Sequence, residues 1–185
     1  MKKIATVYWL LPAKPERDLL CDVVRILRKE FRAPDFEPHL TLFSTKKDRQ
    51  SRKSRGSRKL SASPKQVLRQ ISTRPIRLTT RGVGFSSEFT KTLFLRFESS
   101  PALKKLVTDV GRAAKSRAKT PNNPHLSLLY KKLPRATKKE LATVMKLPFR
   151  SVVFDSIAVV RCASPSRTKA DVEAWKILAT KSLRR

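Results

Sequence analysis

The only two histidines of the chain, His39 and His125, lie in two short stretches of the same pattern. The first stretch reads Pro38-His39-Leu40-Thr41-Leu42 and the second reads Pro124-His125-Leu126-Ser127-Leu128. In a β-strand, side chains two positions apart point to the same face. We therefore expect His39 to share a strand face with Thr41, and His125 with Ser127. The repeat predicts one site that is built from two similar halves.

Two imidazoles beside two hydroxyls suit the cleavage of a phosphodiester by water. Histidine titrates near neutral pH, so one imidazole can accept a proton from water while the other donates a proton to the leaving oxygen. The hydroxyls of Thr41 and Ser127 can donate hydrogen bonds to the phosphate oxygens, on which negative charge grows. The alternative is that each histidine only caps or packs against a strand edge. Repetition of the whole pattern favours the catalytic interpretation.

The two stretches and their flanks resemble the 2H phosphoesterase superfamily, which is named for two H-x-[ST]-x motifs. Within that superfamily, the chain is most similar to the cyclic phosphodiesterase branch. The resemblance extends from about Thr6 to about Leu178. Besides the two motifs, the stretches that carry it are Trp9-Leu10-Leu11-Pro12, Phe36-Glu37-Pro38, Gly82-Val83-Gly84-Phe85, Leu93-Phe94-Leu95 and Tyr130.

The resemblance implies an α+β fold in which two interwoven lobes surround a central cleft. Each lobe of this fold is an antiparallel sheet backed by helices. We therefore expect residues 1–185 to form a single bilobal domain, with a basic, mobile insertion at residues 45–62. The two motif strands are expected to hold matching places in the two halves, as a duplication would produce.

The resemblance also implies metal-independent hydrolysis of cyclic phosphodiesters, without a cofactor. The substrates of the family are nucleoside 2′,3′-cyclic phosphates, RNA ends that carry them, and ADP-ribose 1″,2″-cyclic phosphate. The product keeps its phosphate on the 2′ or 1″ oxygen. In this branch His125 would activate water and His39 would protonate the leaving oxygen. The residues alone do not determine that direction.

Substrate binding is expected to involve Thr41, Ser127 and two aromatic residues, Tyr130 and Phe85, which could stack on a base. Core packing is the alternative for both aromatics, and it is the expectation for Trp9. The chain departs from the family pattern at Lys131-Lys132, where a glycine and an acid are common. These lysines favour longer, phosphate-rich substrates such as RNA ends.

The composition is strongly basic. Forty-three Lys and Arg residues against fourteen Asp and Glu give a formal net charge of +29. Such a chain attracts polyanions before any specific contact forms, which makes RNA a plausible partner. Lys46–Lys59 holds eight basic residues, one acid and no apolar residue. This segment is expected to be either a solvated linker or an RNA-binding arm beside the site.

The cysteine content favours a reducing, cytoplasmic location. Cys21 and Cys162 are too few for a disulfide framework, and no Cys-His spacing is typical of zinc. Residues 4–11 imitate a short signal peptide, but a buried first strand explains them better. No stretch is long enough to span a membrane. A monomer is expected.

The remaining pattern predicts alternating strands and helices. Apolar spacing predicts a helix from Glu16 to the residues before Pro34, and Ser63-Pro64 predicts the start of another. A third helix is expected from Leu103 to Ala114, and a fourth after a capping box at Thr137–Glu140. The expected strands cover 4–11, 36–43, 76–80, 93–97, the second motif, 152–160 and 174–179, with a turn or bulge at Gly82–Gly84 and a loop at 164–171.

Two other functions use the same residues. A basic RNA-binding protein could keep the cleft for recognition without turnover. RNA 2′-5′ ligation, the reverse direction known in a related branch, could use the same pair of histidines. The flanks of the motifs favour the hydrolytic branch over ligation.

Overall fold

The computed structural model describes residues 3–46, 63–116 and 118–183. Nearly all of the expected basic insertion at 45–62, including most of Lys46–Lys59, lies outside the described residues. The expectation made for that segment therefore stays a prediction.

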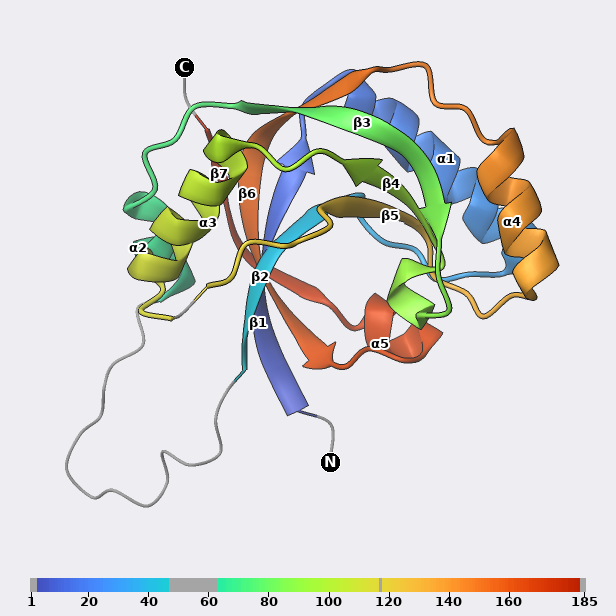
Figure 1. Cartoon of the computed structure of the whole chain (residues 1–185). Helices are drawn as coiled ribbons and strands as arrows, with labels where there is room; N and C mark the ends of the chain where they lie inside the picture. Colours follow the sequence, from blue (N-terminus) through green and yellow to red (C-terminus); the bar gives the residue numbers. More distant parts are fainter. Residues whose placement is uncertain (1–2, 47–62, 117, 184–185) are drawn as a thin grey trace.

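The described strands form one antiparallel sheet that closes into a ring. The strand order is β1-β2-β5-β4-β3-β6-β7, and β1 pairs with β6 as well, so that β7 alone lies outside the ring (Figure 1). The strands are β1 (Lys3–Pro12), β2 (Leu40–Lys46), β3 (Ile76–Phe85), β4 (Leu93–Phe97), β5 (His125–Leu129), β6 (Ser151–Ser164) and β7 (Lys176–Ser182).

The ring divides into two halves of three strands each. One half is β6-β1-β2 and the other is β3-β4-β5. The halves join where Ile76–Thr79 pairs with residues 151–154, and again where Leu40 of β2 pairs with Leu126 of β5. The α+β class with antiparallel strands backed by helices is thus confirmed. The second joint lies inside the two motifs, which places them side by side.

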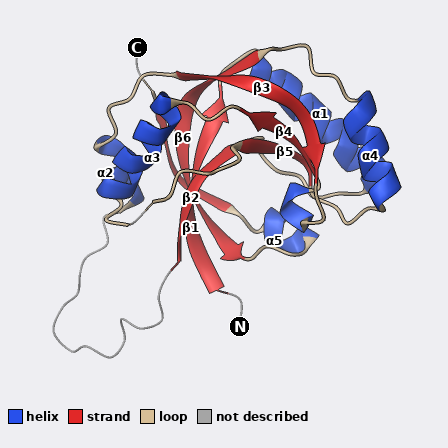
Figure 2. Ribbon diagram, in the orientation of Figure 1, coloured by secondary structure: helices blue, strands red, loops and turns tan. Residues whose placement is uncertain are grey.

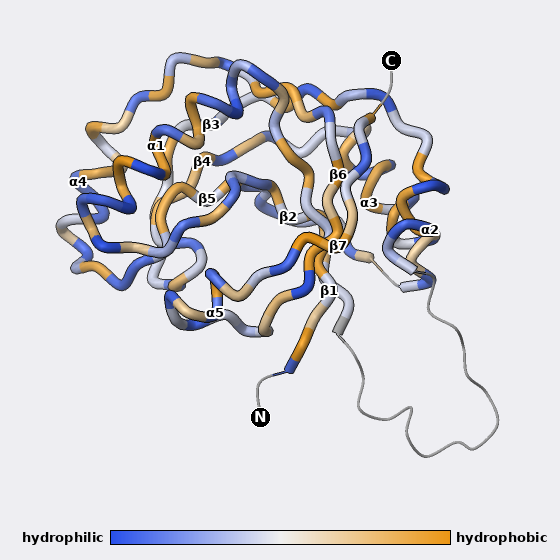
Figure 3. The backbone as a smooth tube through the Cα atoms, turned by 180° about the vertical axis from the view of Figure 1, so that it is seen from behind, coloured by the Kyte–Doolittle hydropathy of each residue, from blue (hydrophilic) through white to orange (hydrophobic). Residues whose placement is uncertain are grey.

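Helices cover the outside of the ring (Figure 2). Helix α1 (Glu16–Phe31) contacts β1 and β5, and α4 (Arg135–Val144) contacts β3 and β4. Helix α2 (Pro64–Arg69) lies between β7 and α3 (Pro101–Ala113), while α5 (Lys169–Glu173) contacts β6. The helices alternate between apolar and polar residues along the chain, as expected for helices with one buried face (Figure 3).

The two faces of β1 pack into different apolar clusters. Tyr8 and Leu10 belong to the main core, which the helices cover. Val7, Trp9 and Leu11 point to the other face and form a smaller cluster with Ala158 and Val160 of β6. Burial on both faces explains why this strand reads as an unbroken apolar run.

Three local expectations were wrong. β2 begins at Leu40 rather than at Phe36, since Pro34 and Pro38 cannot donate to a ladder across this segment. α4 begins at Arg135 after Pro134, so Thr137 lies inside the helix rather than capping it. The expected loop at 164–171 contains the start of α5, which is capped by Thr168 and Asp171.

Two expectations about local structure were confirmed, those for Ser63 and for the glycines at 82–84. The side chain of Ser63 accepts a hydrogen bond from the backbone of Gln66 and caps α2. The glycines at 82–84 produce a bulge within β3, with Gly82 at a φ of 74°. No helix among residues 3–46, 63–116 and 118–183 has both the length and the apolar character needed to cross a membrane.

Candidate active site

Each motif strand contains a β-bulge three residues after its histidine. In β2, Thr41 pairs with Trp9 and Phe43 pairs with Tyr8, so Leu42 is the extra residue. In β5, Ser127 pairs with Phe94 and Leu129 pairs with Leu93, so Leu128 is the extra residue. Bulges bend a strand and redirect its side chains, and they are frequent beside active sites. The two motifs therefore share a backbone distortion as well as a sequence.

An aromatic side chain lies across from each motif hydroxyl and contacts the neighbouring histidine. Trp9 stacks on His39, with ring centroids 3.7 Å apart and planes inclined by 11°. Phe94 meets His125 edge-on, with centroids 5.3 Å apart. On the next strand, each aromatic faces a small residue, since Trp9 pairs with Ala158 and Phe94 pairs with Gly84. The two halves thus have matching layers of side chains.

The two imidazole rings make the same local hydrogen bond. Nδ1 of His39 lies 2.6 Å from the carbonyl oxygen of Glu37, and Nδ1 of His125 lies 2.9 Å from that of Asn123. A carbonyl can only accept, so each Nδ1 carries a proton and donates it. Nε2 of each ring has no hydrogen-bond partner among the described residues and is the nitrogen left for chemistry.

An ion pair supports the segment that orients His39. Arg17 of α1 donates from Nε to the carboxylate of Glu37 at 2.8 Å. This hydrogen bond raises the pKa of Arg17. The carbonyl of the same Glu37 accepts the Nδ1 proton of His39, so α1 is linked to the ring orientation through a single residue.

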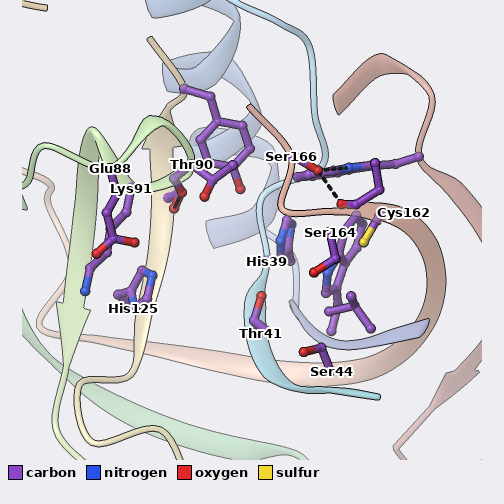
Figure 4. A pocket seen from close by; sticks show the side chains of 16 residues that line it. His39, Thr41, Ser44, Glu88, Thr90, Lys91, His125, Cys162, Ser164 and Ser166 are labelled. Carbon is purple, nitrogen blue, oxygen red and sulfur yellow. Dashed lines mark hydrogen bonds between the residues drawn. The ribbon is translucent and has the colours of Figure 1, made fainter. Parts of the chain in front are cut away.

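Both histidines line one cleft of about 340 Å³. His39, Thr41 and Ser44 lie on one side of it, while His125, Glu88 and Lys91 lie on the other (Figure 4). The sequence-predicted residues Ser127 and Tyr130 also line this cleft. Phe85 is not among the residues that line the cleft; it is half-buried and packs against the main core.

Tyr130 lines the cleft, but most of its side chain is buried. Its ring stacks on Phe36 with centroids 3.9 Å apart, and only 3% of the residue is exposed. Burial raises the pKa of its hydroxyl, although the hydrogen bond with Ser127 opposes this. Tyr130 therefore forms part of the cleft wall, beside Ser127.

Burial determines the charge of His39. The residue is enclosed between Trp9 and Trp175, and its own exposure is 5%. Removal from water disfavours the imidazolium, which lowers the pKa of His39 to about 4 despite the hydrogen bond to Glu37. At neutral pH this ring is therefore uncharged in the free protein.

His125 is less enclosed and has charged neighbours. Burial is again the largest cause of a lowered pKa, and the positive charge of Lys91 lowers the pKa of His125 further. The hydrogen bond to Asn123 and the negative charge of Glu88 act in the opposite direction. The two histidines thus share their geometry but differ in what surrounds them.

The two motif hydroxyls are not equivalent. Ser127 donates from Oγ to the backbone carbonyl of Thr90 at 2.9 Å. The hydroxyl of Thr41 forms no hydrogen bond with the described residues, and Thr41 is exposed in the cleft. Thr41 can therefore donate to a bound anion without giving up an existing partner, whereas Ser127 cannot.

Sequence reasoning missed Trp175 and Lys91, which both line the cleft. Trp175 meets His39 edge-on, and its Nε1 donates to Ser166 at 3.0 Å, which fixes the indole. It lies between α5 and β7, in a region without any motif. Lys91 lies two residues before the apolar strand β4, and its place near an apolar run was the only available signal.

Comparison with known proteins matched one family model and several solved structures. A family model described as the 2′-5′ RNA ligase superfamily matches residues 21–164. A search of curated proteins gave no match.

Solved structures with the same fold are distant in sequence. E. coli LigT in its apo form is 16% identical over 100% of both chains, with a TM-score of 0.57. A protein described only as a phosphoesterase is 14% identical over 100% of both chains, also with a TM-score of 0.57. TT0787 of Thermus thermophilus is 20% identical over 97% of this chain and 98% of its own, with a TM-score of 0.55.

Proposed function

Because the chain belongs to the 2′-5′ RNA ligase superfamily, the 2H phosphoesterases, we propose that it hydrolyses 2′,3′-cyclic phosphodiesters. The substrate class comprises nucleotides, RNA ends and ADP-ribose that carry a cyclic phosphate. The product is a 2′- or 1″-phosphomonoester. His39 and His125 act as the acid–base pair, and no metal ion takes part.

One observation carries this proposal, namely the matched presentation of two imidazoles across one cleft. Each ring is held by the same Nδ1 hydrogen bond and keeps Nε2 without a partner among the described residues. Hydrolysis of a cyclic diester needs a base on one side of phosphorus and an acid on the other. One imidazole on each side of the cleft would meet that requirement.

In the proposed step, the oxygen of water attacks phosphorus while one neutral Nε2 accepts the proton of the water. The bond from phosphorus to the ribose 3′ oxygen breaks, and the protonated Nε2 of the other histidine gives its proton to that oxygen. Thr41 donates a hydrogen bond to a phosphate oxygen on which charge develops. The resemblance assigns His125 as the base and His39 as the acid.

Relatives of known structure are consistent with a nucleotide substrate. E. coli LigT has been solved in complex with ATP, with phosphate and with 3′-AMP. Phosphate and nucleoside groups are the two parts of the substrate proposed for this chain. For this chain we place the substrate in the cleft that both histidines line.

The test is phosphorus NMR of a nucleoside 2′,3′-cyclic phosphate incubated with the protein in the presence of EDTA. A single 2′-monophosphate product is expected. His39→Ala and His125→Ala should each reduce the rate by about 10² to 10⁴-fold, the usual range for a general acid or base. Circular dichroism and thermal unfolding show whether each variant is folded. A folded His39→Ala or His125→Ala variant with wild-type turnover would refute the mechanism.

RNA is proposed as the polymeric form of the substrate, bound in addition through a basic surface. Five cations from neighbouring segments define this surface, which we call the α2–β7 patch: Lys65, Arg69, Arg74, Arg77 and Lys181. Lys65, Arg69 and Lys181 line one depression, and Arg74 and Arg77 line another. Residues 63–80 contain no acid. A phosphate backbone is the partner that fits such a surface.

Ligation is the competing activity within the same superfamily. It would join a 2′,3′-cyclic end to a 5′-hydroxyl, and the same two histidines would serve. The flanks of the two motifs resemble the hydrolytic branch, which favours hydrolysis. Incubating an RNA with a cyclic end together with a 5′-hydroxyl RNA distinguishes the two activities by the length of the product.

A further inference from the structure

The two sides of the cleft differ in their charged residues. Among the described residues that line it, Lys91 is the only lysine or arginine and Glu88 is the only carboxylate, although the whole chain carries forty-three basic residues. Both side chains lie on the side of His125 (Figure 4), Lys91 within and Glu88 next to the short 3-10 turn η2 (Phe89–Lys91). The side of His39 is instead enclosed by two tryptophans.

The backbone around Lys91 is held from several directions. Ser86 donates from Oγ to the carbonyl of Lys91 at 2.6 Å. The following residue, Thr92, is buried; its hydroxyl donates to the carbonyl of Lys131 at 2.7 Å and accepts from the backbone of Lys131. These hydrogen bonds tie the turn to the end of the second motif strand. The turn is therefore a fixed support for the side chain of Lys91.

The ammonium group of Lys91 is positioned but not neutralised. Its Nζ lies 4.7 Å from the centroid of the Phe94 ring, a cation–π contact. The same ring meets His125 edge-on. Among the described residues, Lys91 has no carboxylate partner within ion-pair distance, although Glu88 lies nearby. A cation that lines a cleft without a counter-ion is available to an anion.

On the side of the second motif, the hydroxyl has no spare proton to donate to a bound phosphate. Thr41 has a hydroxyl proton to offer on the side of His39, but the proton of Ser127 is already donated to the carbonyl of Thr90. Thr90 lies in the same turn as Lys91. The motif hydroxyl of this half thus holds the turn in place, and the turn presents an ammonium group instead.

We propose that Lys91 is the phosphate-binding cation of this cleft, donating to a non-bridging phosphate oxygen on the side of His125. This inference rests on the proposed function only in taking the cyclic phosphate as the substrate. Thr41 and Lys91 would then contact the phosphate from opposite halves, and Ser127 would act as a positioning residue for the turn.

The electrostatics around His125 agree with this role. Besides Lys91, the charged groups around it are Glu88 from the turn and Arg96, its exposed partner on β4, and the titratable group across the cleft is His39. Lys91 lowers the pKa of His125 and Glu88 raises it. A phosphate anion bound to Lys91 would offset that positive charge and favour the imidazolium of His125.

The test exploits the presence of only two histidines, which give two imidazole Hε1 signals in a proton NMR spectrum. Each histidine is titrated against pH, and inorganic phosphate is titrated in as the probe. Three variants are compared with the wild type: Lys91→Met, Lys91→Arg, and Lys104→Met as a control that removes the same charge from an exposed position on α3.

Lys91→Met should raise the pKa of His125, since a nearby cation is lost, and should weaken phosphate binding by about tenfold or more. Lys91→Arg and Lys104→Met should both stay close to the wild type. Unchanged phosphate affinity together with an unchanged His125 titration in Lys91→Met would overturn the inference. Neither readout requires turnover, so a protein that proves inactive on cyclic phosphates would refute the proposed function while leaving this test intact.

Discussion

His39 and His125 have the same local geometry, but they differ in the environment that sets their protonation. Trp9 and Trp175 enclose His39, whereas His125 contacts the smaller Phe94 and senses Lys91 and Glu88. Both pKa values lie below the ordinary value for histidine, that of His39 at about 4. In the empty cleft the more enclosed ring therefore loses its proton first as the pH rises.

These shifts predict an acid-shifted pH optimum. Catalysis needs one neutral and one protonated histidine, so the active fraction peaks between the two pKa values. Because both pKa values are lowered in the free protein, the bell-shaped profile of kcat/KM should be centred below pH 6.5, the ordinary pKa of histidine. The substrate's negative charge raises the pKa of nearby imidazoles, so the profile of kcat should be centred at higher pH.

The measurement is initial rates on a nucleoside 2′,3′-cyclic phosphate between about pH 4 and 9 at constant ionic strength. The profile has the same form whichever histidine is the acid, so it tests the environment rather than the assignment of roles. A kcat/KM profile centred at or above about pH 7 would contradict the lowered pKa that burial gives His39.

At the scale of elements, the site depends on two bulged strands that lie side by side. Leu42 and Leu128 are the extra residues, and Leu40 pairs with Leu126 across the joint between the halves. The aromatic layer beside them needs small residues on the outer strands, Ala158 and Gly84. Gly84 is the more demanding position, because a Cβ there would lie 3.1 Å from the Phe94 ring and 3.3 Å from Arg96.

Gly84→Ala should therefore reduce activity more than stability. The Phe94 ring must move by a few tenths of an ångström, and it contacts both His125 and Lys91. We expect kcat to fall by roughly tenfold, because small misplacements of catalytic groups are costly. Overpacking of this size should cost about 1 kcal/mol of the free energy of unfolding. Steady-state kinetics and thermal unfolding measure the two effects.

Gly82→Ala is the matched control, since it makes the same chemical change two residues away. Gly82 has a φ of 74°, and nothing lies within 4 Å of an added Cβ. Alanine there should cost about 1 kcal/mol through backbone strain and leave kcat unchanged. Equal losses of kcat in the two variants would show that the contact with Phe94 is not what matters.

The elements and the motifs were largely predictable from sequence, whereas their assembly was not. The period of two around each histidine identifies the strands and the pairing of imidazole with hydroxyl, and apolar spacing identifies α1 and α3. No local pattern encodes the closure of the ring through β1 and β6, or the bulges at Leu42 and Leu128. Lys91 and Trp175 enter the cleft through that assembly, which explains why the sequence did not single them out.

On the scale of the whole molecule, charge is distributed unevenly. Six of the fourteen acids lie between Glu16 and Glu37, in and just after α1, where Arg25 and Arg28 form ion pairs with Asp22 and Asp35. The α2–β7 patch has no such partners within residues 63–80. Lys181 donates to the carbonyl of Ile71 at 2.6 Å, and Arg77 donates to Ser151 at 3.0 Å, so part of the patch is held in place. Net charge alone would not reveal this asymmetry.

This distribution predicts that RNA binds through unpaired cations rather than through net charge. Binding of a single-stranded RNA is measured by fluorescence anisotropy over a range of salt concentrations, with the slope of log K against log salt as the readout. If Arg74 and Arg77 each contact one phosphate, the double variant Arg74→Gln, Arg77→Gln should bind more weakly and show a slope smaller by about 1.4.

The double variant Arg25→Gln, Arg28→Gln is the control, because it removes the same charge from ion-paired positions and should leave the slope unchanged. Equal effects of the two double variants would mean that RNA senses only the overall charge of the protein, and the α2–β7 patch would then have no special role in binding.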